Sequence, residues 1–553
     1  MPHNIQVIAA GLGHSFFDFI KIYCRDESSG HSINRVAHRL CSLMRKMGVK
    51  TVVVEDLEPT YIEVEAEFLA LRTFFETSLG TLEIQANRLT FISEELDSHD
   101  VSRIPELDDD KFLGSAILIN FKNPDNDLWH TYIFNAIVAT PKIINHKKYG
   151  TLPLLNYYPH IYKNFKRQVY INEFVVHDYK ITGSFFCQQN SVTSVCAHAA
   201  LCMTLNNHSL LNIDLVTPEQ INKTIGIDHQ KIRFLHNKKG LKKDEVDSVL
   251  GKYGLYITYK SFLGEEIREY HDYIYKYIES RCPVLLTFST DKGIDHVVPI
   301  LGHTLNSDTW KPEAELIYSK VGGRLSYFKS SSAYVDNFII HDDNFGMYYC
   351  LPIHSLAGAI FELAGDTAFK AVYATAVVPF GVITPPREAE WTSVLVAITI
   401  LEKLQEKGTE LDSWSKSFLS SINAEPPRPI ITRTLLVEKR SYVMSIEGED
   451  FLGNSFTSEE KEMLTNYLPD KFWLTEMTLP DLYTANKNKI IDFFYPCDLP
   501  PSIDPAVDID NRWIQIRLPG SLRINKNDAT FPMTVKSHFP IFRLYSEQEY
   551  LDW

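Results

Sequence analysis

Hydrophobic positions along the chain predict a protein that mixes helices and strands throughout its length. In the first 150 residues, apolar runs typical of strands alternate with two segments of helical spacing, the first of which ends at Gly48. The expected elements are strands at 4–10, 50–56, 115–121 and 131–140 and helices at 32–48 and 63–78. We therefore expect an N-terminal α/β domain of unknown role over 1–150.

A second pattern follows a loop-like stretch that carries Pro and Gly residues. A strand is expected first, then a helix, then a series of strands, which is the order typical of an α+β fold. The expected elements are a strand at 167–176, a helix at 196–207 and strands at 282–289, 296–304, 313–320, 337–343 and 371–378. We expect this second domain to cover 158–385.

The remaining chain again mixes both periodicities. A long amphipathic helix is expected over 384–408, with Pro in its first turn. Strand patterns follow at 428–437, 472–479, 489–495 and 512–518. We expect a C-terminal mixed helix and strand region over 386–553, so the whole chain belongs to the α+β class in three consecutive parts.

Composition narrows the range of functions. The formal net charge is -15, which argues against binding to nucleic acid or to anionic membranes, because both depend on a basic surface. The most apolar windows are shorter than the ~20 residues that a membrane-spanning helix needs. Eight cysteines in 553 residues are too few for a disulfide scaffold, and the N-terminus lacks the features of a signal peptide. We expect a cytoplasmic protein in which a free reactive thiol can persist.

Cys196 is the strongest candidate for such a thiol. Polar residues precede it in "NSVTSVCAHAA", and the helical pattern begins there. Thr193 or Ser194 is expected to cap this helix. A cysteine at a helix start lies beside unpaired backbone amides and the positive end of the helix dipole, which favour the thiolate.

A nucleophilic thiol needs a base, and three histidines are candidates for that role. His198 is close in sequence, but residues two apart on a helix point to different sides. His296 opens "HVVPILGH", a buried-strand pattern that can hold an imidazole against a facing helix. His303 falls on the opposite face of a regular strand, although Pro299 indicates an edge or a bulge. We therefore predict His296 as the base.

Two further groups would complete the site. The strand pattern "NFIIHDDNFG" ends in Asp342, Asp343 and Asn344, and any of the three can accept a hydrogen bond from the imidazole and fix its tautomer. The same residue types favour a β-turn. Gln188 and Gln189 lie just before the cysteine, and a glutamine amide together with a backbone amide can stabilise an oxyanion.

The order of these residues resembles that of the papain-like cysteine peptidases, nearest the branch that cuts double-glycine leader peptides. In that family a Gln precedes a Cys on a central helix, the His opens a strand of V-V-x-x-x-G character, and a later Asp has a Gly four residues on. The matching residues are Gln189, Cys196, His296, Asp342 and Gly346. The resemblance covers the central region, 158–385, and neither flank.

Two departures from the family pattern keep alternatives open. The interval from Gln189 to Cys196 is one residue longer than is usual in papain-type enzymes, which keeps Gln188 as an alternative. The second acidic residue stands where the branch often has Pro, which keeps Asp343 and Asn344 as alternatives to Asp342.

The resemblance implies a nucleophile helix packed on an antiparallel sheet, and a cysteine peptidase that hydrolyses a peptide or isopeptide bond through an acyl-enzyme. An acyltransferase or transglutaminase-type enzyme could use the same triad, and an inactive binding protein could keep the same fold. The expected partner is a protein or peptide substrate. No metal and no cofactor is expected, and the sequence does not determine the oligomeric state.

Overall fold

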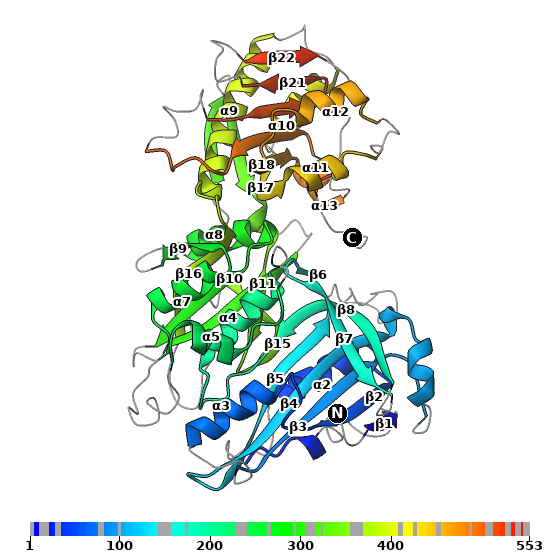
Figure 1. Cartoon of the computed structure of the whole chain (residues 1–553). Helices are drawn as coiled ribbons and strands as arrows, with labels where there is room; N and C mark the ends of the chain where they lie inside the picture. Colours follow the sequence, from blue (N-terminus) through cyan, green and yellow to red (C-terminus); the bar gives the residue numbers. More distant parts are fainter. Residues whose placement is uncertain are drawn as a thin grey trace. The chain divides into compact units, whose positions relative to one another are not determined.

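The computed structural model describes most of the chain (Figure 1). The described residues are 5–9, 21–27, 35–75, 82–97, 101–140, 156–171, 175–208, 211, 213–227, 240–262, 267–290, 295–305, 316–321, 324–353, 369–407, 413–423, 428–448, 455–485, 489–503, 512–525, 532–536 and 543–545. Helices account for 33% of the structure and strands for 39%, in three sheets that include a curled antiparallel half-barrel. The fold class is therefore mixed α+β, with more than one domain.

The chain divides into two compact units. Unit 1 comprises 1–263, 283–304 and 337–378, and unit 2 comprises 264–282, 305–336 and 379–553. Each unit is made of three separate segments of the chain, so neither corresponds to one continuous stretch of sequence. This division differs from the three consecutive domains expected at 1–150, 158–385 and 386–553.

Unit 1 contains a seven-stranded sheet, sheet A, in the order β1-β2-β3-β4-β5-β8-β7. Its strands are β1 (Ile5–Ala9), β2 (Thr51–Leu57), β3 (Ile84–Ile92), β4 (Phe112–Asn123), β5 (Leu128–Ala139), β7 (Lys163–Tyr170) and β8 (Val176–Phe186). Every pairing in the sheet is antiparallel. The helices of this region are α2 (Arg35–Lys46) and α3 (Glu65–Phe75), with 3-10 turns at Lys21–Tyr23, Val101–Glu106 and Asp109–Lys111.

Two expectations for this region need correction. Where the structure describes the N-terminal part, its strands pair only in antiparallel fashion and helices accompany them, so this part is α+β in character rather than α/β. The strand expected at 167–176 spans the end of β7 and the start of β8, which pair as antiparallel neighbours. The sequence did not reveal that the chain changes direction between β7 and β8, because apolar and aromatic residues typical of strands lie on both sides of this point.

A second sheet of unit 1, sheet B, has the order β15-β14-β11-β10-β16-β9, with β6 pairing with β11. Its strands are β6 (Asn156–Pro159), β9 (Leu255–Ser261), β10 (Val284–Thr290), β11 (Asp295–Leu305), β14 (Asn337–Asp342), β15 (Gly346–Pro352) and β16 (Phe369–Pro379). The pairings of β10 with β11 and β16, and of β14 with β11 and β15, are antiparallel. The helices are α4 (Cys196–Asn207), α5 (Pro218–Thr224) and α7 (Lys243–Lys252).

One hydrophobic core joins both sheets of unit 1, and α4 lies within it. The helix contacts β8 of sheet A and both β10 and β14 of sheet B. Its small residues Ala199 and Ala200 are buried in the core that also holds Phe186 from sheet A and Leu285 from sheet B. Because α4 is covered by both sheets, the boundary expected near residue 150 does not separate two cores.

Unit 2 is built on an eight-stranded sheet in the order β12-β13-β17-β18-β19-β20-β21-β22. Its strands are β12 (Leu316–Val321), β13 (Arg324–Ser330), β17 (Ile430–Glu438), β18 (Lys471–Thr478), β19 (Ile491–Pro496), β20 (Gln515–Leu518), β21 (Ser521–Ile524) and β22 (Met533–Lys536). β13 pairs with β17 in parallel, so a hairpin far upstream completes the sheet. The helices are α8 (Ile267–Glu279), α9 (Pro386–Lys407), α10 (Ser413–Ile422), α11 (Lys439–Ser445), α12 (Ser458–Thr465) and α13 (Pro480–Ala485), with a 3-10 turn at Ser331–Tyr334.

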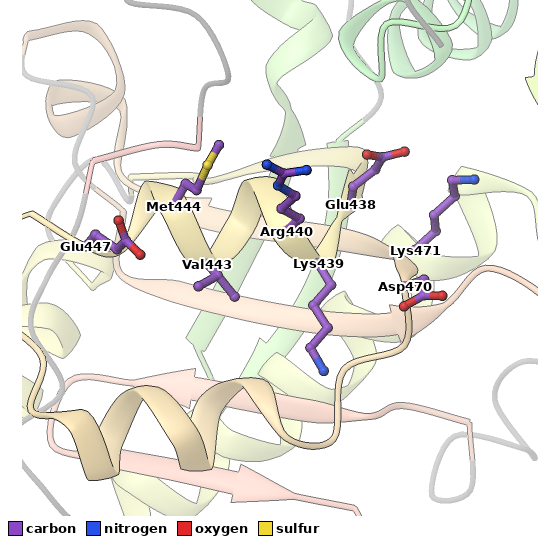
Figure 2. Close-up of a pocket in the computed structure, with 8 residues that line it drawn as sticks. All are labelled: Glu438, Lys439, Arg440, Val443, Met444, Glu447, Asp470 and Lys471. Carbon is purple, nitrogen blue, oxygen red and sulfur yellow. The ribbon is translucent and has the colours of Figure 1, made fainter. Parts of the chain in front are cut away.

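A surface pocket of unit 2 lies beside α11, with a volume of about 630 Å³ (Figure 2). Its lining residues are Glu438, Lys439, Arg440, Val443, Met444, Glu447, Asp470 and Lys471. Acidic and basic side chains occur there in equal number, so the lining has no net charge that would select an anion or a cation. None of the candidate residues chosen from the sequence contributes to it.

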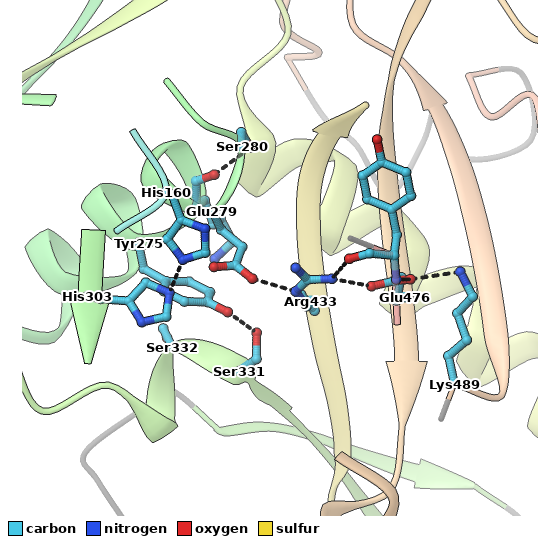
Figure 3. Close-up of polar contacts among 12 residues, drawn as sticks. His160, Tyr275, Glu279, Ser280, His303, Ser331, Ser332, Arg433, Glu476 and Lys489 are labelled. Atoms are coloured by element: carbon cyan, nitrogen blue, oxygen red, sulfur yellow. Dashed lines mark hydrogen bonds and ion pairs between the residues drawn. The ribbon is translucent and has the colours of Figure 1, made fainter. Parts of the chain in front are cut away.

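A chain of buried charges crosses the sheet of unit 2 (Figure 3). Arg433 on β17 contacts Glu279 on α8 at 2.6 Å and Glu476 on β18 at 2.7 Å. Lys489 then contacts Glu476 at 2.8 Å and Asp492 on β19 at 2.9 Å. Because each charge lies between partners of opposite sign, the cost of burying these groups is offset, whereas removal of one member would leave its partners uncompensated.

Candidate active site

Cys196 is the first residue of α4 and is half-buried. The residue that precedes the helix in the capping position is Val195, whose backbone is extended. The capping role expected for Thr193 or Ser194 is therefore wrong. Their side chains instead contact Asn190: Ser194 Oγ accepts its backbone N–H at 3.0 Å, and Thr193 Oγ1 accepts from its Nδ2 at 2.7 Å.

Asn190 organises the loop that leads into α4, a role that the sequence analysis missed. Its Oδ1 accepts hydrogen bonds from the backbone amides of Val192, Thr193 and Ser194 at 2.8–3.0 Å. Its Nδ2 donates to Oε1 of Glu67 on α3 at 2.8 Å. The local signal was present, since an Asn followed by Ser and Thr residues favours a side chain that binds its own backbone. This loop fixes where α4 begins, and therefore where Cys196 lies.

His198 takes a structural position. Its ring is buried, its Nδ1 accepts from the backbone N–H of Val195 at 3.3 Å, and its Nε2 lies 2.7 Å from Oδ1 of Asn222. A carboxamide oxygen only accepts, so Nε2 carries the proton. His198 therefore satisfies an amide at the helix start and links α4 to α5.

His296 lies at the beginning of β11, with its ring between the start of α4 and the end of β14. Its Nε2 is 3.2 Å from Oδ2 of Asp342, and the Cys196 side chain is near enough to the ring to raise the pKa of His296. Burial lowers the pKa of His296, but the hydrogen bonds to Asp342 and Cys196 and the charges of Asp342 and Asp343 outweigh it and raise the pKa well above its usual value. The three side chains thus form a continuous Cys-His-Asp arrangement.

Asp342 is completely buried and its two oxygens have separate partners. Oδ2 faces His296, whereas Oδ1 accepts the backbone amides of Asn344 at 2.7 Å and Phe345 at 3.2 Å. The turn and the histidine contact are therefore made by one carboxylate, as both readings of the sequence allowed. Asn344 contributes its backbone amide to this turn, and no hydrogen bond from its side chain occurs among the described residues.

Gly346 closes the turn in a conformation that favours glycine, with φ at 103°. A Cβ at this position would lie 2.7 Å from Cγ of Arg39 on α2. Arg39 approaches because it donates to the carbonyl oxygens of Met347 at 3.2 Å and Tyr348 at 2.8 Å. The glycine four residues after Asp342 thus allows α2 to clamp the start of β15, and the turn is held in place.

Asp343 is the second buried carboxylate of the site. Its Oδ1 lies 3.8 Å from His296 Nε2, and among the described residues neither of its oxygens has a hydrogen-bond partner. Burial raises its pKa to about 7; the charge of His296 opposes this shift and that of Asp342 adds to it. The ligand atoms of His296, Asp342 and Asp343 lie within 4.8 Å of one another, close enough for one metal ion.

The two glutamines have different environments. The side chain of Gln188 accepts the backbone N–H of Ile133 at 2.9 Å and donates to the backbone carbonyl of Asp343 at 3.1 Å. It therefore joins β5 to the Asp342 turn, and its amide is already engaged. Gln189 is half-buried, and within the described part of the chain no hydrogen bond from its side chain is found. This difference favours Gln189 as the group available to a ligand.

His303 lies away from this arrangement. The ring pairs with the buried His160, with 2.9 Å between the two Nε2 atoms (Figure 3). β11 is an interior strand with a register shift between Ile300 and Gly302. The bulge indicated by Pro299 is therefore present, and the edge position is not.

The cysteines that flank Cys196 are packed in the core. Cys187 and Cys202 are buried, and their side chains contact each other. Burial, followed by the contact with Cys202, raises the pKa of Cys187 well above its usual value. These surroundings suit structural thiols.

No protein-family model and no curated protein matches this chain. In the part of the chain that the structure describes, no helix is long and apolar enough to cross a membrane.

Proposed function

We propose that this protein is a papain-like cysteine peptidase with Cys196 as its nucleophile. The observation that carries the proposal is the position of one buried imidazole beside both a thiol and a carboxylate: the Cys196 side chain raises the pKa of His296, and Asp342 Oδ2 lies 3.2 Å from its Nε2. Three further features support it: the nucleophile at a helix start, the antiparallel sheet behind it, and the resemblance in residue order. The substrate class is a peptide or isopeptide bond.

Each side chain takes a defined role in this mechanism. Asp342 can only accept when ionised, so its contact puts the proton on Nε2 of His296 and leaves Nδ1 for the thiol. The thiolate of Cys196 attacks the carbonyl carbon and forms a C–S bond, while the carbonyl oxygen becomes an oxyanion. His296 then protonates the leaving amine as the C–N bond breaks. Water then attacks the acyl-enzyme and gives a proton to His296; the C–S bond breaks, the acid leaves and the Cys196 thiolate is restored.

The oxyanion would be held at the start of α4. The first amides of a helix have no carbonyl partner within it, so the N–H of Cys196 would be available to the oxygen of the attacked carbonyl. Gln189 supplies the second donor, since the Gln188 amide is held by Ile133 and Asp343. Such a donor contributes on the order of 10²–10³ in turnover.

The first experiment measures covalent labelling by a thiol-directed activity probe. We expect Cys196→Ala to abolish labelling and Cys350→Ala, a change at another half-buried thiol, to preserve it. Burial raises the pKa of Cys24 and Cys282 to about 12, so these thiols stay protonated at neutral pH and do not compete for the probe. Undiminished labelling of Cys196→Ala would refute the proposal.

The second experiment measures turnover and products. We expect His296→Asn to lower turnover by on the order of 10²–10⁴, the usual contribution of a general base. Mass spectrometry of peptide products, with and without an added amine, distinguishes hydrolysis from acyl transfer. Transfer to the amine in preference to water would assign the same triad to an acyltransferase.

A further inference from the structure

One buried cluster in unit 1 holds more negative charge than the proposed reaction requires. It consists of the imidazole of His296 and the carboxylates of Asp342 and Asp343, whose side chains are 8%, 0% and 1% exposed. A Cys-His-Asp triad uses one carboxylate to orient the imidazole. The second carboxylate, that of Asp343, has no task in that mechanism.

Asp343 also lacks the partners that a buried carboxylate normally has. Neither oxygen accepts a hydrogen bond from any described residue, and the recorded ionic contact of Asp343 is the one with His296 at 3.8 Å. His296 can supply at most one positive charge to two carboxylates, so among the described residues Asp343 has no cation or hydrogen-bond donor of its own. Buried charges are normally paired or coordinate a metal, and this carboxylate is directed at the same ring nitrogen as its neighbour.

The positions of the three groups fit a small divalent cation. Tetrahedral zinc with bonds of 2.0–2.2 Å to His and carboxylate ligands has ligand atoms about 3.3–3.6 Å apart. The distances from His296 Nε2 to the two carboxylates are 3.2 Å for Asp342 and 3.8 Å for Asp343, on either side of that range. Imidazole with carboxylates also suits zinc better than magnesium or calcium, which prefer oxygen ligands alone.

We propose that His296, Asp342 and Asp343 form an inhibitory zinc site in which Nε2 and one oxygen of each carboxylate are the ligands. A water molecule would take the fourth position of the tetrahedron. Binding displaces the Nε2 proton to solvent and leaves the two carboxylates and the metal with no net charge. The ion would thus compensate the carboxylate of Asp343, which accepts no hydrogen bond from any described residue.

Zinc would inhibit the enzyme by fixing the tautomer of His296. This inference rests on the proposed function, in which His296 is the base. A neutral imidazole that binds a metal through Nε2 carries its proton on Nδ1. In the proposed mechanism Nδ1 is the atom that accepts the proton of Cys196. Zinc would therefore disable the base without touching the thiol, and removal of zinc by a chelator would restore it.

The test uses the full-length protein, freed of metal with a chelator, and two readouts. Cobalt(II) replaces the spectroscopically silent zinc, and its visible absorption reports binding without requiring activity. The rate of probe labelling at Cys196, with and without zinc, reports inhibition. Asp343→Asn removes one ligand, and Asp295→Asn makes the same change at an exposed position next to His296. Cys196→Ser tests whether the thiol is a ligand, and Asp342→Asn is the second ligand variant.

We expect cobalt to bind the wild-type protein, Asp295→Asn and Cys196→Ser equally. Asp343→Asn should weaken binding at least ~10-fold, since loss of even an outer-shell partner has an effect of that size, and zinc should no longer slow its labelling. If Asp343→Asn does not fold, Asp342→Asn should show the same loss of cobalt binding. Absorption that persists in the ligand variants, is absent from the wild type, or disappears in Cys196→Ser would overturn the zinc site. Failure of the metal-free wild type to label would instead refute the peptidase, and the cobalt absorption would still report the site.

Discussion

Replacement of Gly346 by alanine tests how the Asp342 turn is held beside His296. Gly346 has φ at 103°, a conformation that alanine adopts only with strain, and a Cβ there would lie 2.7 Å from Arg39 Cγ and 2.9 Å from Arg39 Cβ. Carbon atoms at rest are ~3.5–4.0 Å apart, so α2 and the turn must separate by several tenths of an ångström. Because Arg39 Cβ is fixed to the helix backbone, a change of rotamer cannot relieve both contacts.

The expected cost has two parts. The left-handed conformation costs a non-glycine residue roughly 1–2 kcal/mol, of which about 0.4–1 kcal/mol is recovered because alanine restricts the unfolded chain. Overpacking against Arg39 adds about 1–3 kcal/mol. The matched control is Gly48→Ala: Gly48 has a similar φ of 88°, but nothing lies within 4 Å of the added Cβ. The difference between the two variants should therefore be about 1–3 kcal/mol.

Hydrogen exchange locates the effect within unit 1. The amides of Asn344 and Phe345 bond to Asp342 Oδ1, so their protection reports the turn directly. We expect Gly346→Ala to lower that protection by roughly 5–150-fold relative to Gly48→Ala, which is the same free-energy difference at tenfold per ~1.4 kcal/mol. Labelling of Cys196 should slow in parallel, since Asp342 no longer fixes His296.

Equal protection of these two amides in Gly346→Ala and Gly48→Ala would refute this reasoning. It would mean that the contact between Arg39 and the turn does not determine where Asp342 lies. Loss of protection over the whole chain would point to global unfolding, which a thermal transition separates from the local effect.

Three further predictions address the loop, the oxyanion site and unit 2. Asn190→Ala should destabilise unit 1 by about 2–6 kcal/mol, because the buried amides of Thr193 and Ser194 lose their acceptor at ~1–3 kcal/mol each; chemical denaturation followed by Cys196 labelling measures it. Gln189→Ala should lower turnover by on the order of 10²–10³ with unchanged stability, whereas Gln188→Ala should lower the thermal midpoint; the reverse result would exchange their roles. Arg433→Met should cost about 3–5 kcal/mol, because it removes the guanidinium that contacts the buried carboxylates of Glu279 and Glu476; an unchanged urea midpoint would contradict it.

The sequence was most informative where structure is local. The helix that begins at Cys196, the strand that begins with His296, and the Asp342–Gly346 turn all follow from short patterns of apolar spacing and turn-forming residues. The helix expected at 384–408 is found as α9, Pro386–Lys407. These features depend on backbone preferences and burial within one element, which a few neighbouring residues express.

The hydrogen-bond partners of side chains were harder to predict from the sequence, even between residues close together in the chain. Thr193 and Ser194 are good capping residues by type, but Asn190 takes their hydroxyls, and the helix begins after Val195 instead. Gln188 and Gln189 cannot be separated by sequence, because the difference arises from Ile133 on a strand of another region. Hydrogen-bond competition of this kind depends on which groups the fold brings within 3 Å.

By itself, the sequence determined the residue types and the local backbone of the candidate site: a thiol at a helix start, a histidine on a strand, and a carboxylate in a glycine-closed turn. Only the tertiary structure decided which of them meet, that the buried Asp343 has no hydrogen-bond partner among the described residues, and that 264–282 and 305–336 belong with the C-terminal unit. The physical reason is the distance along the chain over which each kind of interaction acts. Periodicity and turn chemistry act within one element, whereas sheet order and side-chain contacts depend on packing between residues far apart in the chain.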